Sequence, residues 1–295
     1  MPAIWKVSIV TPCLNAERFI RETVESVLAQ DYPQIEYLVM DGGSTDATLD
    51  ILREYGNRLT VNSTKDAGQA DAINRGFRRS TGEIFAWLNA DDTYLPGAVS
   101  LAVRSLDEHP ETAAVYGDAL QVDEPGRVIG PYPTETFDRN RLNHTCFICQ
   151  PACFLRREAF ERAGMLNAGL HYALDYDLWI RLSRSQAMVR IPGTLATSRM
   201  HSASKTLGRR SRAYREAIDV AREHFGYAPY DWIYGYCSHL LDKRDQFFET
   251  SGFSIGKVAL SLVLGTWWNR RQYRRFWRDW AAGVGIGHSG TRGNP

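Results

Sequence analysis

Short apolar runs and amphipathic stretches alternate along the first ninety residues. Four of these runs predict buried strands: KVSIVTP (6–12), IEYLVM (35–40), LTVNST (59–64) and EIFAWLN (83–89). In the stretch 17–30, Ile20, Val24 and Val27 recur at helical spacing and predict an amphipathic helix. Further helices are predicted over 47–56, where Ser44 or Thr45 can act as the N-cap, and over 66–77 and 96–110. Strands that are apolar throughout and alternate with helices predict a parallel sheet covered on both faces.

The second part of the chain has a less regular pattern. It predicts a hairpin, a strand followed by a helix, a second helix and a long strand, over 113–133, 150–164, 174–185 and 187–201. From about residue 211 onward the pattern is helical. These patterns divide the chain into an α/β domain over 1–206 and a helical C-terminal extension over 207–295.

Polar side chains follow the predicted strands. Asn15, Asp41 and Asp66 lie just after a strand or at the start of the next helix, and the adjacent pair Asp91 and Asp92 follows the fourth strand. Because ligands bind beyond the carboxyl ends of the strands in such sheets, these groups are expected at one edge. Adjacent carboxylates repel each other unless they are solvated or share a cation, and Mg²⁺ or Mn²⁺ takes carboxylates together with substrate phosphates. The pair therefore indicates a metal site, with a solvated loop as the alternative.

The composition is that of an ordinary globular protein, with 44% hydrophobic and 23% charged residues in a chain of 295. A formal net charge of +1 creates no global field for nucleic acid, so no nucleic-acid partner is expected. The N-terminus lacks the pattern of a secretory signal, and no stretch reaches about 18 uninterrupted apolar residues. A cytoplasmic protein without a membrane-spanning helix is therefore expected.

Five cysteines raise one further alternative. Their odd number and the absent signal indicate reduced thiols. The segment CFICQPAC has the spacing Cys-x2-Cys-x3-Cys with His144 nearby, which leaves a zinc site open. Because a second ligand pair at normal spacing is missing, packing in the core is the favoured interpretation.

Several separated motifs occur in one order along the chain: TPCLNAERFI, DGGSTDAT, KDAGQADAINRGF, WLNADDTYLPGA, QPACFLRREAFERAGMLN, LDYDLWIRL and RMHSASKT. Together they closely resemble the family 2 glycosyltransferases over about residues 5–206. The resemblance implies an inverting enzyme of the GT-A fold, with a Rossmann-like, mostly parallel sheet flanked by helices. It also implies a nucleotide-sugar-binding half over 1–110 and an acceptor half over 111–206.

The resemblance implies where the donor binds. The loop after the first strand would hold the nucleotide base through Thr11, Pro12, Asn15 and Glu17. Asp41 matches the aspartate that accepts a hydrogen bond from the base, although it could instead simply lead into the Gly-Gly turn. Asp66 and Gln69 would form a second stretch of the donor site. Asn74 belongs either to that stretch or to the structure of its helix.

The segment NADD matches the Asp-x-Asp region of the family, with Asn89 at the position of the first aspartate. The resemblance implies that Asn89 bonds the ribose, while Asp91 and Asp92 share the binding of Mn²⁺ or Mg²⁺ and of the donor. His201, at the end of a strand, is implied at the metal or the diphosphate. The cationic groups implied to screen the leaving diphosphate are Lys205 and, as the second candidate, Arg199.

The segment LDYDLW resembles the Glu-Asp motif whose aspartate is the general base of the family, and Asp175 falls on that aspartate. Leu174 stands where glutamate is usual, which affects the expected positioning of the acceptor. Asp177 is the second candidate for the base, and otherwise charges the start of the helix. In the implied reaction, Asp175 takes the acceptor proton while the acceptor oxygen attacks opposite the diphosphate and inverts the anomeric centre.

The resemblance favours a UDP-sugar donor over thymidine or guanosine donors. It implies a glycan or lipid-linked acceptor in the assembly of cell-envelope polysaccharide or glycolipid. Two other functions remain open. A nucleotidyltransferase should carry a Gly-rich basic loop after the first strand, which TPCLNAERF lacks. A non-catalytic nucleotide-sugar-binding component of an assembly complex is kept open by Leu174 and Asn89.

The segment TWWNRRQYRRFWRDW (266–280) interleaves five arginines with aromatic residues. This composition suits a membrane interface, where rings lie at headgroup depth and arginines meet lipid phosphates. The protein would then be peripheral on the inner face of the membrane. In the alternative interpretation, the aromatic side chains pack on the catalytic domain and the arginines face water.

Overall fold

The computed structural model describes residues 5–202, 204–243 and 254–285. The chain forms two compact units: residues 1–137 with 147–204, and residues 138–146 with 205–295. The parts of the predicted helical extension at 244–253 and 286–295 lie outside the described residues.

The predicted α/β domain over 1–206 includes residues 138–146, which the structure groups with the second unit. They belong to the second unit because side chains of this segment bond to its helices. The Asn143 amide donates a hydrogen bond to the Tyr227 hydroxyl at 3.1 Å, and the His144 ring lies 2.8 Å from the Asp231 carboxylate. No local pattern in the sequence indicates these partners.

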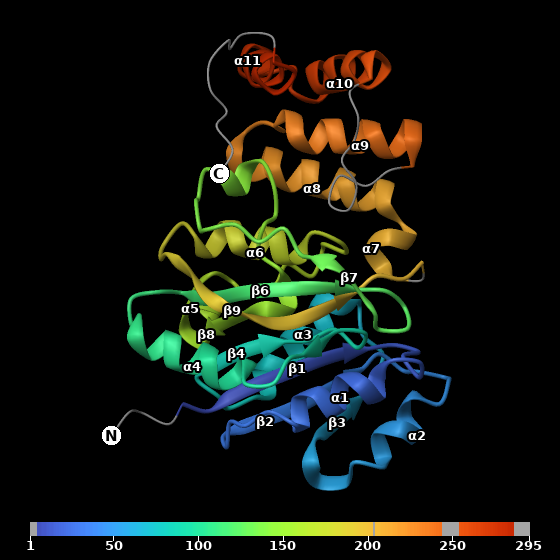
Figure 1. The fold of residues 1–295 in the computed structure, drawn as a ribbon, viewed down its shortest axis with the longest axis vertical. Helices are drawn as coiled ribbons and strands as arrows, with labels where there is room; N and C mark the ends of the chain where they lie inside the picture. Colours follow the sequence, from blue (N-terminus) through green and yellow to red (C-terminus); the bar gives the residue numbers. More distant parts are fainter. Residues whose placement is uncertain (1–4, 203, 244–253, 286–295) are drawn as a thin grey trace. The chain divides into compact units, whose positions relative to one another are not determined.

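The first unit is built on a mixed sheet (Figure 1). Within the described residues the strand order is β3-β2-β1-β4-β8-β6-β9-β5, and β7 pairs with β6. The strands are β1 (Val7–Cys13), β2 (Ile35–Asp41), β3 (Thr60–Ser63), β4 (Ile84–Trp87), β5 (Thr93–Tyr94), β6 (Ala114–Val122), β7 (Val128–Pro131), β8 (Cys153–Arg156) and β9 (Met188–Arg199).

The four N-terminal strands of the order are parallel, which confirms the predicted parallel arrangement of this half. β1 pairs with β2 and β4, and β2 pairs with β3. The register sets Cys13 opposite Asp41 and Asp41 opposite Ser63, so the carboxyl ends of these strands meet at one edge. The other half is mixed, because β8 runs antiparallel to β4 and β6 while β9 runs parallel to β6.

Helices cover both faces of this sheet, as the apolar strands predict. One face carries α1 (Ile20–Leu28), α2 (Thr48–Arg53) and α4 (Ala98–Glu108). On that face Val7 and Ile9 of β1 pack in one core with Ile20, Leu52 and Val99. Alternate residues of each strand point to the opposite face, so the two cores are separated by the sheet.

The opposite face carries α3 (Gln69–Arg79), α5 (Arg157–Arg162) and α6 (Leu174–Leu182). Phe77 of α3 stacks on Phe85 of β4 with ring centroids 4.2 Å apart, and Phe160 of α5 packs edge-on against Phe77 at 5.1 Å. Trp179 of α6 stacks on Trp87 of β4 at 5.7 Å. These aromatic contacts fix all three helices to the strand that leads into the acidic pair. The short 3₁₀ helices of this unit are η1 (Gly56–Arg58) and η3 (Gln150–Ala152).

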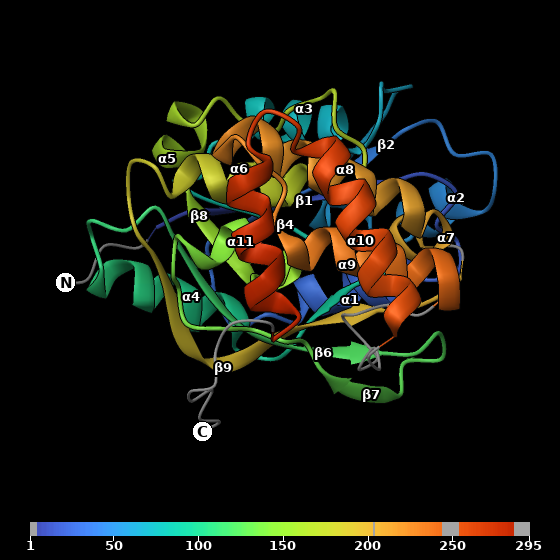
Figure 2. The ribbon, with the colours of Figure 1, turned by 90° about the horizontal axis from the view of Figure 1, so that it is seen from above.

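The second unit is helical, which confirms the predicted helical extension. Its described elements are η2 (Arg141–Asn143), α7 (Lys205–Gly208), α8 (Arg210–Phe225), α9 (Tyr230–Asp242), α10 (Ile255–Trp268) and α11 (Tyr273–Gly283). α9 contacts α8, α10 and α11, and α10 lies beside α11 (Figure 2). The buried Asn269 side chain exchanges hydrogen bonds with the backbone of Ala228 at 2.7 and 3.0 Å, which ties the α10–α11 turn to the α8–α9 turn.

Two further observations bear on the sequence predictions. Among the residues placed by the structure, no helix is both long enough and apolar enough to cross a membrane. All five cysteine side chains are buried thiols, in agreement with the packing interpretation. Cys149 and Cys153 lie in the first unit, whereas Cys146 belongs to the second, so CFICQPAC is divided between the units.

Candidate active site

Hydrogen bonds join the loops that follow β1 and β2. The side-chain oxygen of Asn15 accepts the backbone N–H of Thr45 at 2.8 Å, and the Glu17 carboxylate accepts the N–H of Ala47 at 2.9 Å. Asn15 has a φ of 51°, in the left-handed region that asparagine tolerates better than most residues. The side chains of the predicted base-binding loop therefore also set the shape of this edge of the sheet.

Asp41, at the end of β2, is buried at the centre of its loop. Its carboxylate accepts hydrogen bonds from the backbone N–H groups of Gly43 and Ser44, at 3.0 and 3.1 Å, and from the hydroxyls of Ser44 and Ser63. Burial alone would raise the pKa of Asp41, but these hydrogen bonds outweigh burial and hold the pKa below its ordinary value. Asp41 is thus an ionised anchor for the loop.

Asp66 lies against the loop that follows β2. A Cβ atom on Gly42 would lie 2.7 Å from Asp66 Oδ2, so a residue larger than glycine at position 42 would displace this carboxylate. Asp66 also accepts the N–H of Gly68 at 2.9 Å. A Cβ atom on Gly68 would lie 3.8 Å from Nδ1 of His171, in the segment before α6. The exits of β2 and β3 and the approach to α6 therefore adjoin one another.

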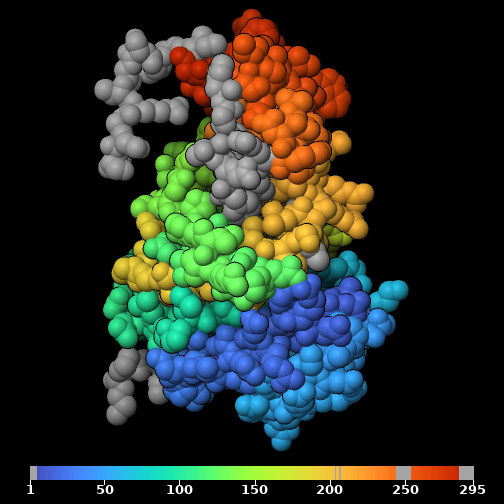
Figure 3. All heavy atoms as spheres, turned by 45° about the vertical axis from the view of Figure 1, so that its right-hand side comes forward, coloured from blue at the N-terminus to red at the C-terminus, as the bar shows by residue number. Residues whose placement is uncertain are grey.

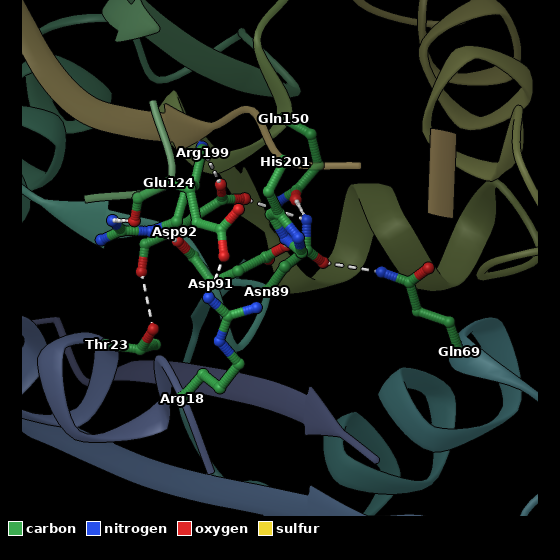
Figure 4. Close-up of polar contacts among 10 residues, drawn as sticks. All are labelled: Arg18, Thr23, Gln69, Asn89, Asp91, Asp92, Glu124, Gln150, Arg199 and His201. Atoms are coloured by element: carbon green, nitrogen blue, oxygen red, sulfur yellow. Dashed lines mark hydrogen bonds and ion pairs between the residues drawn. The ribbon is translucent and has the colours of Figure 1, made fainter. Parts of the chain in front are cut away.

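Asn89, just after β4, is bonded to three other side chains (Figure 4). Its amide nitrogen donates to the Asp92 carboxylate at 3.0 Å and to the side-chain oxygen of Gln150 at 3.1 Å. Its oxygen accepts a hydrogen bond from the Gln69 amide at 2.6 Å. Gln150 in turn donates to the carbonyl of Trp87 at 2.6 Å. The amide at position 89 therefore uses both its donor and its acceptor groups within the protein.

Asp92 is the buried member of the acidic pair, with 3% of its surface exposed. Its Oδ1 accepts the backbone N–H of Arg199 at 3.0 Å, and its Oδ2 accepts the Asn89 amide. Its backbone carbonyl accepts the Thr23 hydroxyl at 2.9 Å. Burial, together with the adjacent charge of Asp91, raises the pKa of Asp92 well above its ordinary value. Both oxygens of this carboxyl group are engaged in holding the loop.

Asp91 points toward His201 (Figure 4). Its side chain is 27% exposed, and its Oδ2 lies 2.9 Å from Nε2 of His201. The His201 ring is mostly buried and packs against Phe19 with ring centroids 4.9 Å apart. Among the described residues, no hydrogen-bond partner meets the buried Nδ1 of His201. The two like charges are thus separated, because Asp92 turns into the protein and Asp91 turns toward an imidazole.

Arg199, the last residue of β9, supports the acidic loop from inside the protein. Its Nε donates to the carbonyl of Asp91 at 3.0 Å, and a terminal nitrogen donates to the carbonyl of Glu124 at 2.8 Å. The guanidinium group also pairs with the Glu22 carboxylate and lies 4.9 Å from the centre of the Phe19 ring. These contacts direct the Arg199 side chain into the protein.

Asp175 and Asp177 both lie in the first turn of α6. The buried Asp177 carboxylate accepts two hydrogen bonds from Arg181, at 2.7 and 2.9 Å. Asp175 is half-buried, and its carboxylate accepts the N–H of Tyr176 at 2.8 Å. Burial, with an added effect of the Asp175 charge, raises the pKa of the Cys153 thiol well above its ordinary value. Asp175 is therefore the more exposed of the two carboxylates and lies near β8.

Four other predicted residues lie in β1, α3 and α7. The Thr11 and Pro12 side chains are buried in β1, where the Thr11 hydroxyl lies 3.0 Å from the Tyr37 hydroxyl. Asn74 exchanges hydrogen bonds with the backbone of Leu166 at 2.8 and 3.1 Å, as a structural helix residue would. Lys205 begins α7 and belongs to the second unit.

Two features of this site were not predicted. Gln150 opens the motif QPACFLRR, and nothing nearby in the sequence indicates that its side chain bonds Asn89. The inward position of Arg199 was also missed, since its partners Glu22 and Glu124 lie far away along the chain. Their positions depend on how the strands are arranged in the sheet.

The groups at Asp91 and His201 fit a divalent cation. A carboxylate oxygen and an imidazole nitrogen are both ligands of Mn²⁺. Their separation of 2.9 Å matches the roughly 3 Å between neighbouring ligands of an octahedral cation with bonds of about 2.1 Å. Within the described ranges, no group of three or more His, Cys, Asp or Glu residues could hold a metal. Such a cation would therefore need oxygens from a bound phosphate, as Mg²⁺ sites with one or two carboxylates commonly do.

Comparison with known proteins identifies relatives of this chain. The family model described as Glycosyl transferase family 2 matches residues 8–164. An uncharacterized glycosyltransferase of Rickettsia typhi is 28% identical over 213 residues, which cover 68% of this chain and 65% of that protein. A PGL/p-HBAD biosynthesis glycosyltransferase of Mycobacterium bovis is 33% identical over 187 residues, which cover 62% of this chain and 71% of that protein. The chain thus spans just under two thirds of the Rickettsia typhi relative.

Solved structures resemble the fold along nearly the whole chain. Residues 1–349 of S. aureus TarS, in complex with UDP-GlcNAc, give a TM-score of 0.61 at 16% identity, covering 94% of this chain and 92% of that one. The mannosyltransferase PcManGT from Pyrobaculum calidifontis, in complex with GDP-Man and Mn²⁺, gives a TM-score of 0.60 at 20% identity, covering 97% of this chain and 89% of that one. At these identities the likeness concerns the fold, which is GT-A-like.

Proposed function

We propose, since this chain belongs to glycosyl transferase family 2, that it transfers a sugar from a nucleotide-diphosphate donor to an acceptor hydroxyl with inversion. One observation carries the proposal: the Asp91–His201 pair lies at the carboxyl edge of the sheet, and the loop that carries Asp91 is held by Asn89, Asp92 and Arg199. In open α/β sheets this edge is where ligands bind.

The donor base would lie against the loops that follow β1 and β2. Thr11 and Pro12 would contribute backbone groups, because their side chains are buried. Asn15 and Glu17 would line the loop. Asp41 would act by shaping its loop, since its carboxylate already accepts several hydrogen bonds. A second stretch of the donor site, formed by Asp66 and Gln69, would follow at the start of α3.

Asp91 and His201 would hold Mn²⁺ or Mg²⁺, which when bound neutralises charge that develops on the departing diphosphate. Asp92 takes a different part in this proposal from that of Asp91. Because its two oxygens bond Asn89 and the Arg199 backbone, Asp92 would position the loop that presents Asp91. Lys205 is proposed, as the family resemblance implies, to screen the diphosphate.

Asp175 would accept the proton of the acceptor hydroxyl as its oxygen attacks the anomeric carbon. Of the two carboxylates at the start of α6, Asp177 is buried and bound to Arg181, whereas Asp175 is the more exposed, which favours Asp175 as the base. The acceptor oxygen forms its bond on one face of the sugar while the bond to the diphosphate breaks on the other face, so the anomeric centre inverts. A positioned base contributes about 10²–10⁴-fold to such a step.

The donor and acceptor classes are proposed from the family resemblance and from named relatives. A UDP-sugar is the favoured donor, and GDP-sugars are included because the structural neighbours bind UDP-GlcNAc or GDP-Man. The mycobacterial relative is named for PGL/p-HBAD biosynthesis. This supports a lipid-linked or glycan acceptor in envelope glycolipid or polysaccharide assembly.

The proposal is tested by donor binding followed by turnover. Thermal shift against UDP-, TDP- and GDP-sugars, with and without Mn²⁺, should identify a donor that raises Tm. With that donor, Asp175→Asn should keep the shift and lose about 10²-fold or more of the transfer or donor hydrolysis rate. Asp177→Asn is the matched control, and should lower Tm while keeping most of the turnover of its folded fraction.

Three outcomes would count against this function. If no nucleotide sugar shifts Tm, donor binding is excluded. Full turnover in Asp175→Asn would remove this residue as the base. A wild-type protein that binds the donor but neither transfers nor hydrolyses its sugar would be a nucleotide-sugar-binding component instead.

A further inference from the structure

The helix α10 buries its polar side. Lys257, Ser261 and Gly265 are its buried residues and recur every four positions, so they share one face. The Lys257 ammonium group pairs with the Asp242 carboxylate. The Ser261 hydroxyl accepts the indole N–H of Trp280, at 3.1 Å. The fully buried positions of α10 are therefore an ion-paired lysine, a hydroxyl and a glycine.

The outward side of α10 is apolar. Ile255, Val263 and Trp267 are 79%, 65% and 63% exposed, and the exposed Ala259 continues the same spacing. A helix on the surface of a soluble domain normally shows the reverse pattern, with its apolar face toward the core. An exposed stripe of this kind marks an interaction surface.

The helix α11 widens this apolar side. Trp277 is 48% exposed and donates its indole N–H to the Thr266 hydroxyl of α10, at 2.9 Å. Tyr273 packs edge-on against Trp277, with ring centroids 5.4 Å apart. On the inner side, Phe276 is buried where a Cβ on Gly265 would lie 1.9 Å from its ring. α10 and α11 thus form one hairpin, whose side chains reach the surface of the second unit in Figure 3.

The exposed charges around this stripe are positive. Arg270 and Arg271 lie in the turn between the helices, and Arg274 and Arg278 lie on α11; all four are exposed. Between residues 254 and 285, the acidic side chain is Asp279, whose carboxylate accepts the Tyr230 N–H at 2.6 Å. The apolar stripe is therefore bordered by guanidinium groups with little opposing charge.

We propose that this surface, the stripe Ile255, Val263, Trp267, Tyr273 and Trp277 with its four bordering arginines, docks on an anionic phospholipid bilayer. Indole and phenol rings lie stably at headgroup depth, and guanidinium groups bind lipid phosphates. A second copy of the chain fits less well, because a two-fold interface would bring the two sets of arginines together. With 14 residues, α10 is suited to lie along the surface of the bilayer. This inference stands apart from the proposed transferase activity.

The test is co-flotation of the full chain with vesicles of phosphatidylcholine, alone or mixed with phosphatidylglycerol. The wild-type protein should float with the mixed vesicles and much less with the neutral ones. Trp267→Ser combined with Trp277→Ser, and separately Arg270→Gln combined with Arg271→Gln, should each weaken binding about tenfold or more. The matched control for the arginines is Arg78→Gln with Arg79→Gln, an exposed adjacent pair on the other unit, which should bind as the wild type does.

A second control, Val128→Ser with Ile129→Ser, removes exposed apolar side chains from β7 and should also leave binding unchanged. Circular dichroism and Tm check the fold of every variant, and the arginine pair keeps the test valid if the tryptophan pair unfolds. Absence of flotation with the mixed vesicles would overturn the proposal, as would equal flotation of the tryptophan, arginine and wild-type proteins. The proposal would also be overturned if the wild-type protein formed a dimer that does not bind vesicles and the paired tryptophan substitutions made it a monomer. Because no donor is needed, failure here leaves the proposed transfer reaction untouched.

Discussion

The side-chain amide of Asn89 donates a hydrogen bond to the buried carboxyl group of Asp92, across 3.0 Å. This contact explains why asparagine stands where the resembled Asp-x-Asp segment has its first aspartate. A carboxylate at position 89 would lose the donors that meet Asp92 and Gln150, and would set a second negative charge beside the first in a buried place. The buried Asp92 carboxyl group is therefore stabilised by an uncharged side chain at position 89.

Asn89→Asp should lower the free energy of unfolding by about 1–3 kcal/mol, because it removes two donors and leaves buried oxygens facing one another. Urea unfolding followed by circular dichroism measures this. Asn57→Asp, at an exposed position of η1, is the control and should stay within about 0.5 kcal/mol of the wild type. Equal stability of the two variants would show that the Asn89 hydrogen bonds contribute nothing net.

Asp91→Asn and Asp92→Asn should separate metal binding from loop structure. Asp91→Asn should keep the Tm of the unliganded protein within a few degrees and lose the Mn²⁺-dependent part of the donor shift. Asp92→Asn should lower the free energy of unfolding by about 1–3 kcal/mol, because an amide cannot accept at both oxygens. Calorimetric titration with Mn²⁺ and the donor checks the first expectation. If Asp92→Asn alone abolished the Mn²⁺ effect at normal stability, Asp92 would be the ligand.

Gly42→Ala should destabilise the protein by about 1–3 kcal/mol, because the new Cβ would lie 2.7 Å from Asp66 Oδ2. Combining it with Asp66→Ala should recover much of that loss, so that a double-mutant cycle shows coupling. Gly130→Ala is the control: nothing described lies within 4 Å of its Cβ, and its φ is not positive. Additive effects of Gly42→Ala and Asp66→Ala would refute the proposed clash.

Arg199→Lys should lower the free energy of unfolding by about 1–3 kcal/mol despite the retained charge. An ammonium group cannot reproduce the bonds to Glu22 and to the carbonyls of Asp91 and Glu124 at the same time. Arg190→Lys is the matched control, because Arg190 pairs with Asp118 at a partly exposed site and should change stability by less than about 1 kcal/mol. Chemical denaturation of both variants decides, and similar losses would contradict the supporting role of Arg199.

The second unit should lose stability as pH rises above the ordinary pKa of histidine. A hydrogen bond to Asp231 raises the pKa of His144 above its ordinary 6.5, although burial opposes the shift. The nearby charge of Asp279 raises it too, while Arg141 lowers it. Because the folded state binds the His144 proton more tightly, the stabilisation from this proton is full below pH 6.5. It disappears as pH rises through the pKa of His144 in the folded state.

Scanning calorimetry between about pH 6 and pH 9 should therefore show a falling Tm. His144→Gln and Asp231→Asn should each flatten that decline, since either change removes the coupled proton. A slope that is unchanged in both variants would show that another group controls it.

Apolar periodicity determined the strands and helices of the first unit well. The helix predicted over 66–77 forms at Gln69–Arg79, and the four predicted parallel strands form at the expected places. Burial of one helix face or of a whole strand leaves a pattern that can be read within ten residues. The motifs likewise determined the family, because each is a short segment whose residues lie next to one another.

Local patterns did not predict the partners of individual side chains. Ser44 or Thr45 was expected to cap α2. The Ser44 hydroxyl instead bonds Asp41 and the Thr45 hydroxyl bonds Asn15, while Asp46 accepts the N–H of Thr48 at 3.0 Å. The sequence could not distinguish Asp91 from Asp92, because both follow the same strand. Their difference depends on His201 and the Arg199 backbone, which β9 brings alongside from more than a hundred residues away.

The sequence by itself determined which elements form, which family the chain belongs to and which edge of the sheet gathers its polar groups. Only the tertiary structure decided that Asp92 is buried while Asp91 meets His201, that residues 138–146 join the second unit, and that α10 turns its apolar side outward. The physical reason is that periodicity reports how a segment is buried on average. The orientation of one carboxylate or one helix face depends on the particular groups that pack against it. Those groups come from distant parts of the chain, and their identity is set when the elements assemble.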